Sequence, residues 1–164
     1  FEIQRGDWKA THQDFSYASH TYGGMWVSQG GLLGAPATSD GAVAQTTLSI
    51  PEAGDYRVWS KYQAPPYFQY PHRIEVLQNG KVVFSHVYGK NGKPRLWSFS
   101  GESDELWWFW GVDHDAAEAP KTAARLSRGT ATVRVTTLKG EGKIPVGKRF
   151  IDFVVLTTES GDTY

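Results

Sequence analysis

The chain has 164 residues, which is enough for one domain with a sizeable core and too short for two domains of ordinary size. Lys plus Arg and Asp plus Glu number 17 each, so we expect neither a basic field that attracts nucleic acid nor a disordered acidic tail. The sequence contains no run of roughly 20 apolar residues that predicts a membrane span, and because it has no Cys, thiol chemistry and Cys-based metal sites are excluded.

The first residues suggest how the domain is organised. The chain begins without Met, inside a predicted strand over Phe1 to Trp8. We therefore expect residues 1–164 to form one domain taken from a longer protein, monomeric by itself and with other domains of the same chain as neighbours.

Most of the chain alternates apolar and polar residues with period two between Gly, Pro, Asn and Asp, which predicts short antiparallel strands. The clearest predicted strands are 42–50, 55–62, 72–78, 81–87, 131–138 and 150–157. Within 55–62, the alternation predicts a half-buried strand. One face carries Tyr56, Val58 and Tyr62, and the other carries Arg57, Trp59 and Lys61.

Two further segments complete the prediction of fold. The dipeptide Asn79-Gly80 between alternating runs predicts a β-hairpin, because both central positions of a type I′ turn need positive φ. The Ala-rich stretch 115–124 lacks an apolar stripe and contains Pro120, so we predict a long loop with at most one helical turn. Eight or nine strands without an internal repeat predict an all-β, two-sheet antiparallel jelly-roll β-sandwich.

Three segments in chain order carry a family resemblance: 54–62, 72–80 and 149–156, containing G-x-Y-x-V, the Asn79-Gly80 hairpin and I-D-x-V-x-L. Together they resemble the galactose-binding-like β-sandwich domains, the plan of many non-catalytic carbohydrate-binding modules. The resemblance implies a domain that binds a polysaccharide or oligosaccharide and targets an attached enzyme to it. It also implies a secreted or cell-surface bacterial protein.

The resemblance extends to a structural calcium ion. Families of this kind often hold calcium with acidic residues of the first strand and the Asp of the closing strand. The matching positions are Glu2, Gln4 and Asp152. Gln4 removes one carboxylate, which weakens the expected affinity because calcium prefers charged oxygen ligands.

The first candidate binding segment is a Pro-bracketed aromatic run. Sugars are recognised by an aromatic ring under the apolar face of the pyranose and by polar side chains at its hydroxyls. Pro65, Pro66 and Pro71 restrict this loop. Its candidate ligand-binding residues are Tyr67, Gln69, Tyr70, His72 and Arg73. The alternative is that its rings pack down over the open end of the sandwich.

The second candidate segment is the aromatic run at 107–110. If it is a strand, Trp108 and Trp110 share one face, and we predict that they bind ligand together with Asp113. The alternative is a core layer beneath a loop. Tyr22, in the polar-aromatic segment 12–26, completes the candidate list.

Two other functions stay open at this stage. One is a structural domain whose exposed rings pack against a neighbouring domain. The other is a small jelly-roll polysaccharide lyase, with Tyr67 or Tyr70 and His72 as base and acid, or a glycosidase that uses two of Glu102, Asp104 and Glu105. No specific catalytic motif is present, so we predict a protein that is not an enzyme.

Overall fold

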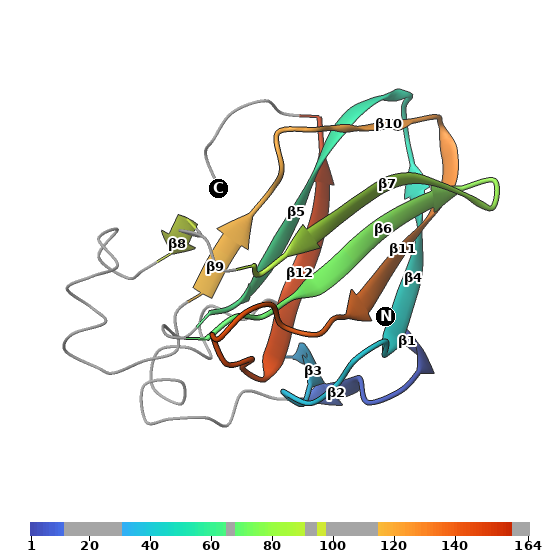
Figure 1. Ribbon diagram of the computed structural model, residues 1–164. Coiled ribbons are helices and arrows are strands. Elements are labelled where there is room, and N and C mark those ends of the chain that lie inside the picture. The colour runs from blue at the N-terminus through green and yellow to red at the C-terminus, as the bar shows by residue number, and fades with distance from the viewer. Residues whose placement is uncertain (12–30, 65–67, 91–94, 98–114, 159–164) are drawn as a thin grey trace.

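The computed structural model describes residues 1–11, 31–64, 68–90, 95–97 and 115–158, and these residues form strands and connections with no helix (Figure 1). The strands are β1 (Glu2–Arg5), β2 (Lys9–Thr11), β3 (Leu32–Ala35), β4 (Val43–Ile50), β5 (Gly54–Gln63), β6 (His72–Gln78), β7 (Lys81–Tyr88), β8 (Arg95–Trp97), β9 (Asp115–Glu118), β10 (Ala124–Leu126), β11 (Gly129–Thr137) and β12 (Arg149–Thr157). In the described part of the chain, no segment forms a helix that could cross a bilayer.

The strands form two antiparallel sheets. A five-stranded sheet has the order β1-β4-β11-β6-β7, and a seven-stranded sheet has the order β2-β3-β12-β5-β9-β8, with β10 also paired to β5. The two sheets form two layers in Figure 1. The all-β, two-sheet sandwich expected from the sequence is therefore confirmed.

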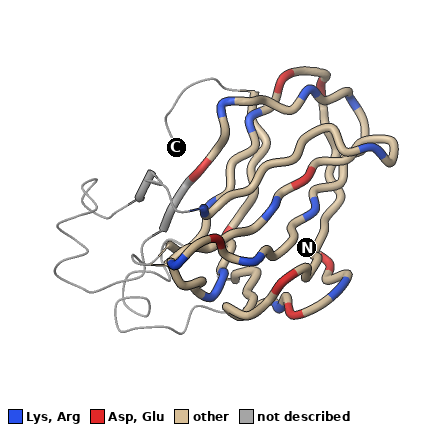
Figure 2. Tube along the Cα trace, viewed as in Figure 1, with Lys and Arg blue, Asp and Glu red and all other residues tan. Residues whose placement is uncertain are grey.

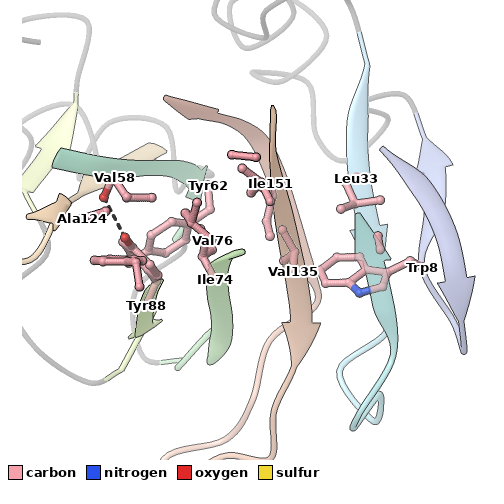
Figure 3. Close-up of a cluster of buried hydrophobic side chains, with 14 of the residues drawn as sticks. Trp8, Leu33, Val58, Tyr62, Ile74, Val76, Tyr88, Ala124, Val135 and Ile151 are labelled. Carbon is pink, nitrogen blue, oxygen red and sulfur yellow. Dashed lines mark hydrogen bonds between the residues drawn. The ribbon is translucent and has the colours of Figure 1, made fainter. Parts of the chain in front are cut away.

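The core lies between the sheets and is built by the predicted alternation. Tyr56, Val58 and Tyr62 of β5 are buried there. Val58 and Tyr62 lie beside Ile74 and Val76 of β6 and Tyr88 of β7 in this cluster (Figure 3). The Tyr88 hydroxyl of β7 donates a hydrogen bond of 2.6 Å to the Val58 carbonyl of β5, which joins the sheets inside the core. Burying a large apolar side chain stabilises a fold by roughly 1.5–3 kcal/mol, so this layer is the main source of stability.

The turn between β6 and β7 agrees with its prediction. Asn79 and Gly80 both have positive φ, at 50° and 72°. These values are those that a two-residue hairpin turn requires. The hairpin projects away from the rest of the sandwich, at the right of Figure 1.

The outer face of β5 differs from the half-buried strand that we predicted. Trp59 and Lys61 are buried on this face, although their positions alternate with the core residues. Lys61 Nζ lies 2.9 Å from a carboxylate oxygen of Asp152 and 5.6 Å from the centroid of the Phe153 ring. A buried charge without a partner is strongly destabilising, and Asp152 of the neighbouring strand supplies the partner.

Two other predictions of secondary structure are wrong. Asp115–Glu118 forms β9, where we predicted a loop, because it pairs with both β5 and β8. The strand predicted over residues 1–8 breaks at Gly6, which has φ of 81° and whose Cβ, if it had one, would lie 2.7 Å from Ala42 Cβ. After this break the chain passes from the five-stranded sheet to the seven-stranded sheet.

Candidate functional site

We name as the loop end the connections 36–41, 68–71, 89–90 and 138–148, which are tied together by hydrogen bonds at one end of the sandwich. Loops at the end of a sandwich are where rigid scaffolds usually present binding residues. The segment 68–71 runs beside residues 145–147, with backbone hydrogen bonds from Gln69 N to Pro145 O and from Gly147 N to Gln69 O, each 2.9 Å. Residues 68–71 of the aromatic loop are thus fixed to residues 145–147 before any ligand binds.

The Gln69 side chain braces this loop. Its amide nitrogen donates to the carbonyls of Glu141, at 2.9 Å, and Ile144, while its oxygen accepts from Glu141 N at 3.0 Å. At Gly140 a Cβ would lie 2.7 Å from Gln69 Nε2, so Gly permits this close approach. Because Gln69 is buried and its amide is used internally, the structure places it as a support for the loop rather than as a ligand contact.

Arg149 is a second support, which our sequence reasoning did not identify. Its fully buried guanidinium donates to the carbonyls of Pro36 (2.8 Å), Ala37 (3.0 Å), Pro71 (3.4 Å) and Leu138. Burial lowers the pKa of Arg149. One side chain therefore satisfies carbonyls from three connections that are far apart in sequence, and a guanidinium suits this task because it carries five donors in a fixed plane.

The predicted ligand residues Tyr70 and His72 lie in the core. The Tyr70 ring packs near Tyr62, with centroids 6.5 Å apart, and the His72 ring stacks on Tyr88 at 5.6 Å. Both side chains are buried, so neither presents a face on which a sugar ring can stack. For Tyr70, this arrangement matches the alternative that we considered, in which the rings of the loop pack over the open end of the sandwich.

His72 also joins the two sheets through hydrogen bonds. Its Nδ1 lies 2.8 Å from the Tyr70 carbonyl, which can only accept, so Nδ1 carries the proton. Nε2 then accepts from the Ser60 hydroxyl at 3.0 Å. Burial lowers the pKa of His72 to about 4, with Arg149 and His86 adding smaller shifts in the same direction. The imidazole is therefore neutral near pH 7.

Among the described residues of the loop, Phe68 is the aromatic residue that faces solvent. Its exposed fraction is 45%, whereas Gln69 and Tyr70, which follow it directly, are buried. On another connection of the loop end, Lys90 Nζ pairs with a carboxylate oxygen of Glu141 at 2.9 Å, and both side chains are largely exposed. The loop end thus presents an exposed ring and exposed polar groups, which are the two kinds of group that stack on a pyranose and contact its hydroxyls.

Charged residues of both signs occur over the described part of the chain. Lys, Arg, Asp and Glu are interspersed over the view in Figure 2, and Lys90 pairs with Glu141. Lys and Arg outnumber Asp and Glu among the described residues, so their charge is compatible with a neutral or an anionic glycan.

Of the other predicted ligand-binding residues, Arg73 lies on β6 and the rest lie outside the described part of the chain. Arg73 lies on the outward side of β6, where it pairs in register with Thr136 and Val87, on the opposite side from His72. Tyr22, Tyr67, Trp108, Trp110 and Asp113 lie outside the described residues, as do Glu102, Asp104 and Glu105, and their roles stay predictions.

The predicted calcium ligands do not come together in one sheet. Glu2 and Gln4 are exposed on β1, the edge of the five-stranded sheet, whereas Asp152 belongs to β12 of the other sheet and pairs with Lys61. Among the described residues, no group of three or more His, Asp or Glu side chains is arranged to hold a metal ion. Calcium binding stays a prediction of the resemblance.

A second polar cluster, not foreseen from the sequence, connects β9 with β7. One carboxylate oxygen of Glu118 accepts hydrogen bonds from the Tyr62 hydroxyl, at 2.7 Å, and from Gly89 N, at 3.0 Å. Its other oxygen lies 3.9 Å from His86 Nε2. Burial raises the pKa of Tyr62 well above its usual value, and the charge of Glu118 adds to the shift, so the phenol stays a donor. The cluster lies beside the loop end because Gly89 belongs to both.

Comparison with solved structures places this arrangement in a known fold. A family 35 carbohydrate-binding module from an environmental isolate matches with a TM-score of 0.55 and 12% identity over 94% of this chain and 85% of that chain. The family 35 module of Abf62 from Cellvibrio japonicus matches with a TM-score of 0.53 and 12% identity over 97% of this chain and 89% of that chain. The expected likeness to galactose-binding-like carbohydrate-binding modules is thus confirmed at the level of fold.

A larger protein contains the same fold as one of its parts. A xanthan lyase from Paenibacillus matches with a TM-score of 0.57 and 15% identity over 98% of this chain but only 13% of the lyase. No protein-family model and no curated protein matches the sequence.

Proposed function

We propose that this domain is a non-catalytic carbohydrate-binding module that holds a polysaccharide at its loop end. The observation that carries the proposal is the exposed ring of Phe68 on a segment that Gln69 fixes to residues 141–147. A fixed ring loses little conformational entropy on binding, which favours a weak but specific contact. The fold shared with family 35 carbohydrate-binding modules supports the same function.

The proposed contacts follow from the chemistry of sugars. The Phe68 ring stacks on the apolar face of a pyranose, and Lys90 donates to hydroxyl groups while Glu141 accepts from them. Phe has no polar atom of its own, so we propose that the Lys90–Glu141 ion pair, on other connections of the loop end, supplies the hydrogen bonds that fix the sugar's orientation. Tyr67, Trp108 and Trp110 are proposed as further stacking rings on sequence grounds.

We propose that the module acts by tethering. One ring and a few hydrogen bonds give modest affinity, and a weak site gains its effect by raising the local concentration of an attached enzyme on the glycan. A secreted or cell-surface bacterial protein is the natural setting for such an arrangement. The match to a small part of the Paenibacillus lyase supports a domain of this kind within a longer enzyme.

Catalysis is the less favoured function because the Ser60–His72 pair and Tyr70 are inaccessible. Ser60 and His72 form a hydrogen-bonded pair, but both side chains are fully buried in the core. A polysaccharide cannot reach a nucleophile or a base there without unfolding of the loop end. The lyase alternative with Tyr70 as the base meets the same obstacle.

One observation favours interdomain packing as a second candidate function. Val82 and Val83 expose apolar surface next to the β6–β7 turn, away from Phe68. If this surface packs against another domain, the isolated protein should self-associate and ignore glycans. A Val82→Ser, Val83→Ser variant should then become monomeric in size-exclusion chromatography.

The proposed function is tested by screening the purified domain on a glycan array and in affinity gels, with neutral and acidic polysaccharides side by side and with calcium or chelator. A reducing-end assay on the same polysaccharides is run in parallel. Specific binding without new reducing ends supports the proposal. Absence of binding to all glycans contradicts it, and new reducing ends indicate an enzyme.

A further inference from the structure

We infer that Glu118 is a positioning residue for glycan binding, which fixes the Phe68 segment and the β8–β9 pair relative to each other. The inference rests on the proposed function for its consequence in binding, but its geometry stands without it. Among the described residues, Glu118 hydrogen-bonds to Tyr62 and Gly89, not to the Lys90–Glu141 pair, and lies near His86. It acts through Gly89.

The Glu118 carboxylate bridges the two sheets. Glu118 ends β9 of the seven-stranded sheet, and the same carboxylate oxygen accepts from Tyr62 of β5 and from Gly89, the residue that follows β7 of the five-stranded sheet. An ionised carboxylate that accepts an O–H and an N–H makes two charge-assisted hydrogen bonds. The bridge therefore resists separation of the sheets at this end.

A backbone hydrogen bond connects Gly89 to the aromatic loop. The Gly89 carbonyl accepts a hydrogen bond of 2.8 Å from Tyr70 N. Gly89 has a φ of 67°, and a Cβ at this position would lie 2.2 Å from the Tyr70 carbonyl oxygen. The peptide groups of Gly89 and Tyr70 thus approach as closely as Gly permits. Glu118, by holding the amide of Gly89, holds the segment that carries Phe68.

Within the seven-stranded sheet, Glu118 also holds the pair of strands β8 and β9. β9 pairs with β8 through Arg95, Leu96 and Trp97, so residues 98–114 connect two strands that lie side by side. Glu118 anchors the end of this pair to Tyr62. One carboxylate therefore links the Phe68 segment to the β8–β9 pair.

The experiment compares three variants of the domain. Glu118→Ala removes the acceptor for Tyr62 and Gly89. Glu118→Gln keeps an oxygen that accepts both hydrogen bonds. Glu75→Ala is the control, because Glu75 is also a partly buried strand carboxylate, paired with Arg134 on the outer face of the other sheet. Affinity for the glycan that binds wild type and hydrogen exchange of the Tyr70 and Gly89 amides are measured for each.

The inference predicts that Glu118→Ala weakens glycan binding by about tenfold or more and speeds exchange of both amides. Rescue by Glu118→Gln to within about threefold of wild type separates positioning from a direct charge contact with the glycan. Wild-type affinity and exchange in Glu118→Ala overturn the inference, as does a loss in Glu118→Gln as large as in Glu118→Ala.

Wild type that binds no glycan and a Glu118→Ala variant that does not fold are interpreted as follows. If wild type binds no glycan, the proposed function fails, and the exchange rates alone decide whether Glu118 fixes the loop. If Glu118→Ala does not fold, Tyr62→Phe replaces it, because only one hydroxyl donor to Glu118 is lost. Weaker binding or faster Tyr70 exchange in Tyr62→Phe then supports the inference, and wild-type behaviour in both contradicts it.

Discussion

Ser60 and His72 meet across the two sheets, with the serine hydroxyl 3.0 Å from the imidazole Nε2 and both side chains fully buried. The pair resembles a nucleophile and its base, yet it lies in the core and holds the sheets together. Protonation of the His72 imidazole is therefore expected to affect the stability of the fold and not catalysis.

The protein should lose stability as the pH falls from about 6.5 to about 4. Burial lowers the pKa of His72 to about 4, so the unfolded chain, with a pKa near 6.5, takes up the proton first. The stabilisation is complete above about 6.5 and is lost as the pH falls through the folded pKa, by roughly 3 kcal/mol. Chemical unfolding of wild type and His72→Asn over this range measures the effect. The difference between the two proteins should narrow at acid pH, and a constant difference would contradict the account.

Arg149 should matter more for stability than a surface arginine. Arg149→Met removes the side-chain donor from four carbonyls of the loop end and should cost about 3 kcal/mol or more, because the carbonyls of Pro36 and Pro71 keep a backbone donor but those of Ala37 and Leu138 lose the Arg149 donor. Arg125→Met is the control, because Arg125 pairs with Asp55 on the exposed surface. This substitution should change the free energy of unfolding by no more than about 0.5 kcal/mol. Equal midpoints of denaturation for the two variants would show that Arg149 does not brace the loops.

Gly89 and Gly80 provide a matched pair for the close approach at the loop end. Both have positive φ, but a Cβ at Gly80 meets no atom within 4 Å, whereas at Gly89 it meets the Tyr70 backbone at 2.2 Å. Gly80→Ala should cost about 1 kcal/mol through its backbone conformation alone. Gly89→Ala should cost at least about 3 kcal/mol because the loop must also move. Similar melting temperatures for the two would rule out the tight contact.

Calcium is predicted by the family resemblance to raise the melting temperature, because an ion bound only by the folded state stabilises it. Melts in calcium, magnesium and chelator measure the shift, and Glu2→Gln should abolish it without other damage because Glu2 is exposed. Identical melting temperatures in calcium and in chelator would show that the folded domain binds no calcium.

The sequence was a good guide to the strands that alternate over seven or more residues. Tyr56, Val58 and Tyr62 fall on one face by their spacing, and that face is the core. Asn79-Gly80 forms the predicted hairpin because only a few residue types accept its backbone conformation. The short strands β8 to β10 were not predicted because three or four residues are too few to show a period.

The candidate site was predicted only in part, because alternation does not say which face is solvent. Phe68 and Tyr70 lie in the same loop, and the sequence favoured Tyr70, but the structure buries Tyr70 and exposes Phe68. The supports of the site join residues distant in sequence, such as Arg149 with Pro36 and Glu118 with Gly89. No local pattern marks such contacts, since they depend on how the two sheets meet.

The most direct test of the account is affinity electrophoresis of Phe68→Ala beside Phe1→Ala in gels that contain a glycan bound by wild type. The two residues are of the same type and almost equally exposed, at 45% and 46%, so the two changes remove similar apolar surface. We predict that Phe68→Ala loses most of its retardation, while Phe1→Ala is retarded like wild type. Equal retardation of all three proteins would contradict a binding site at the loop end.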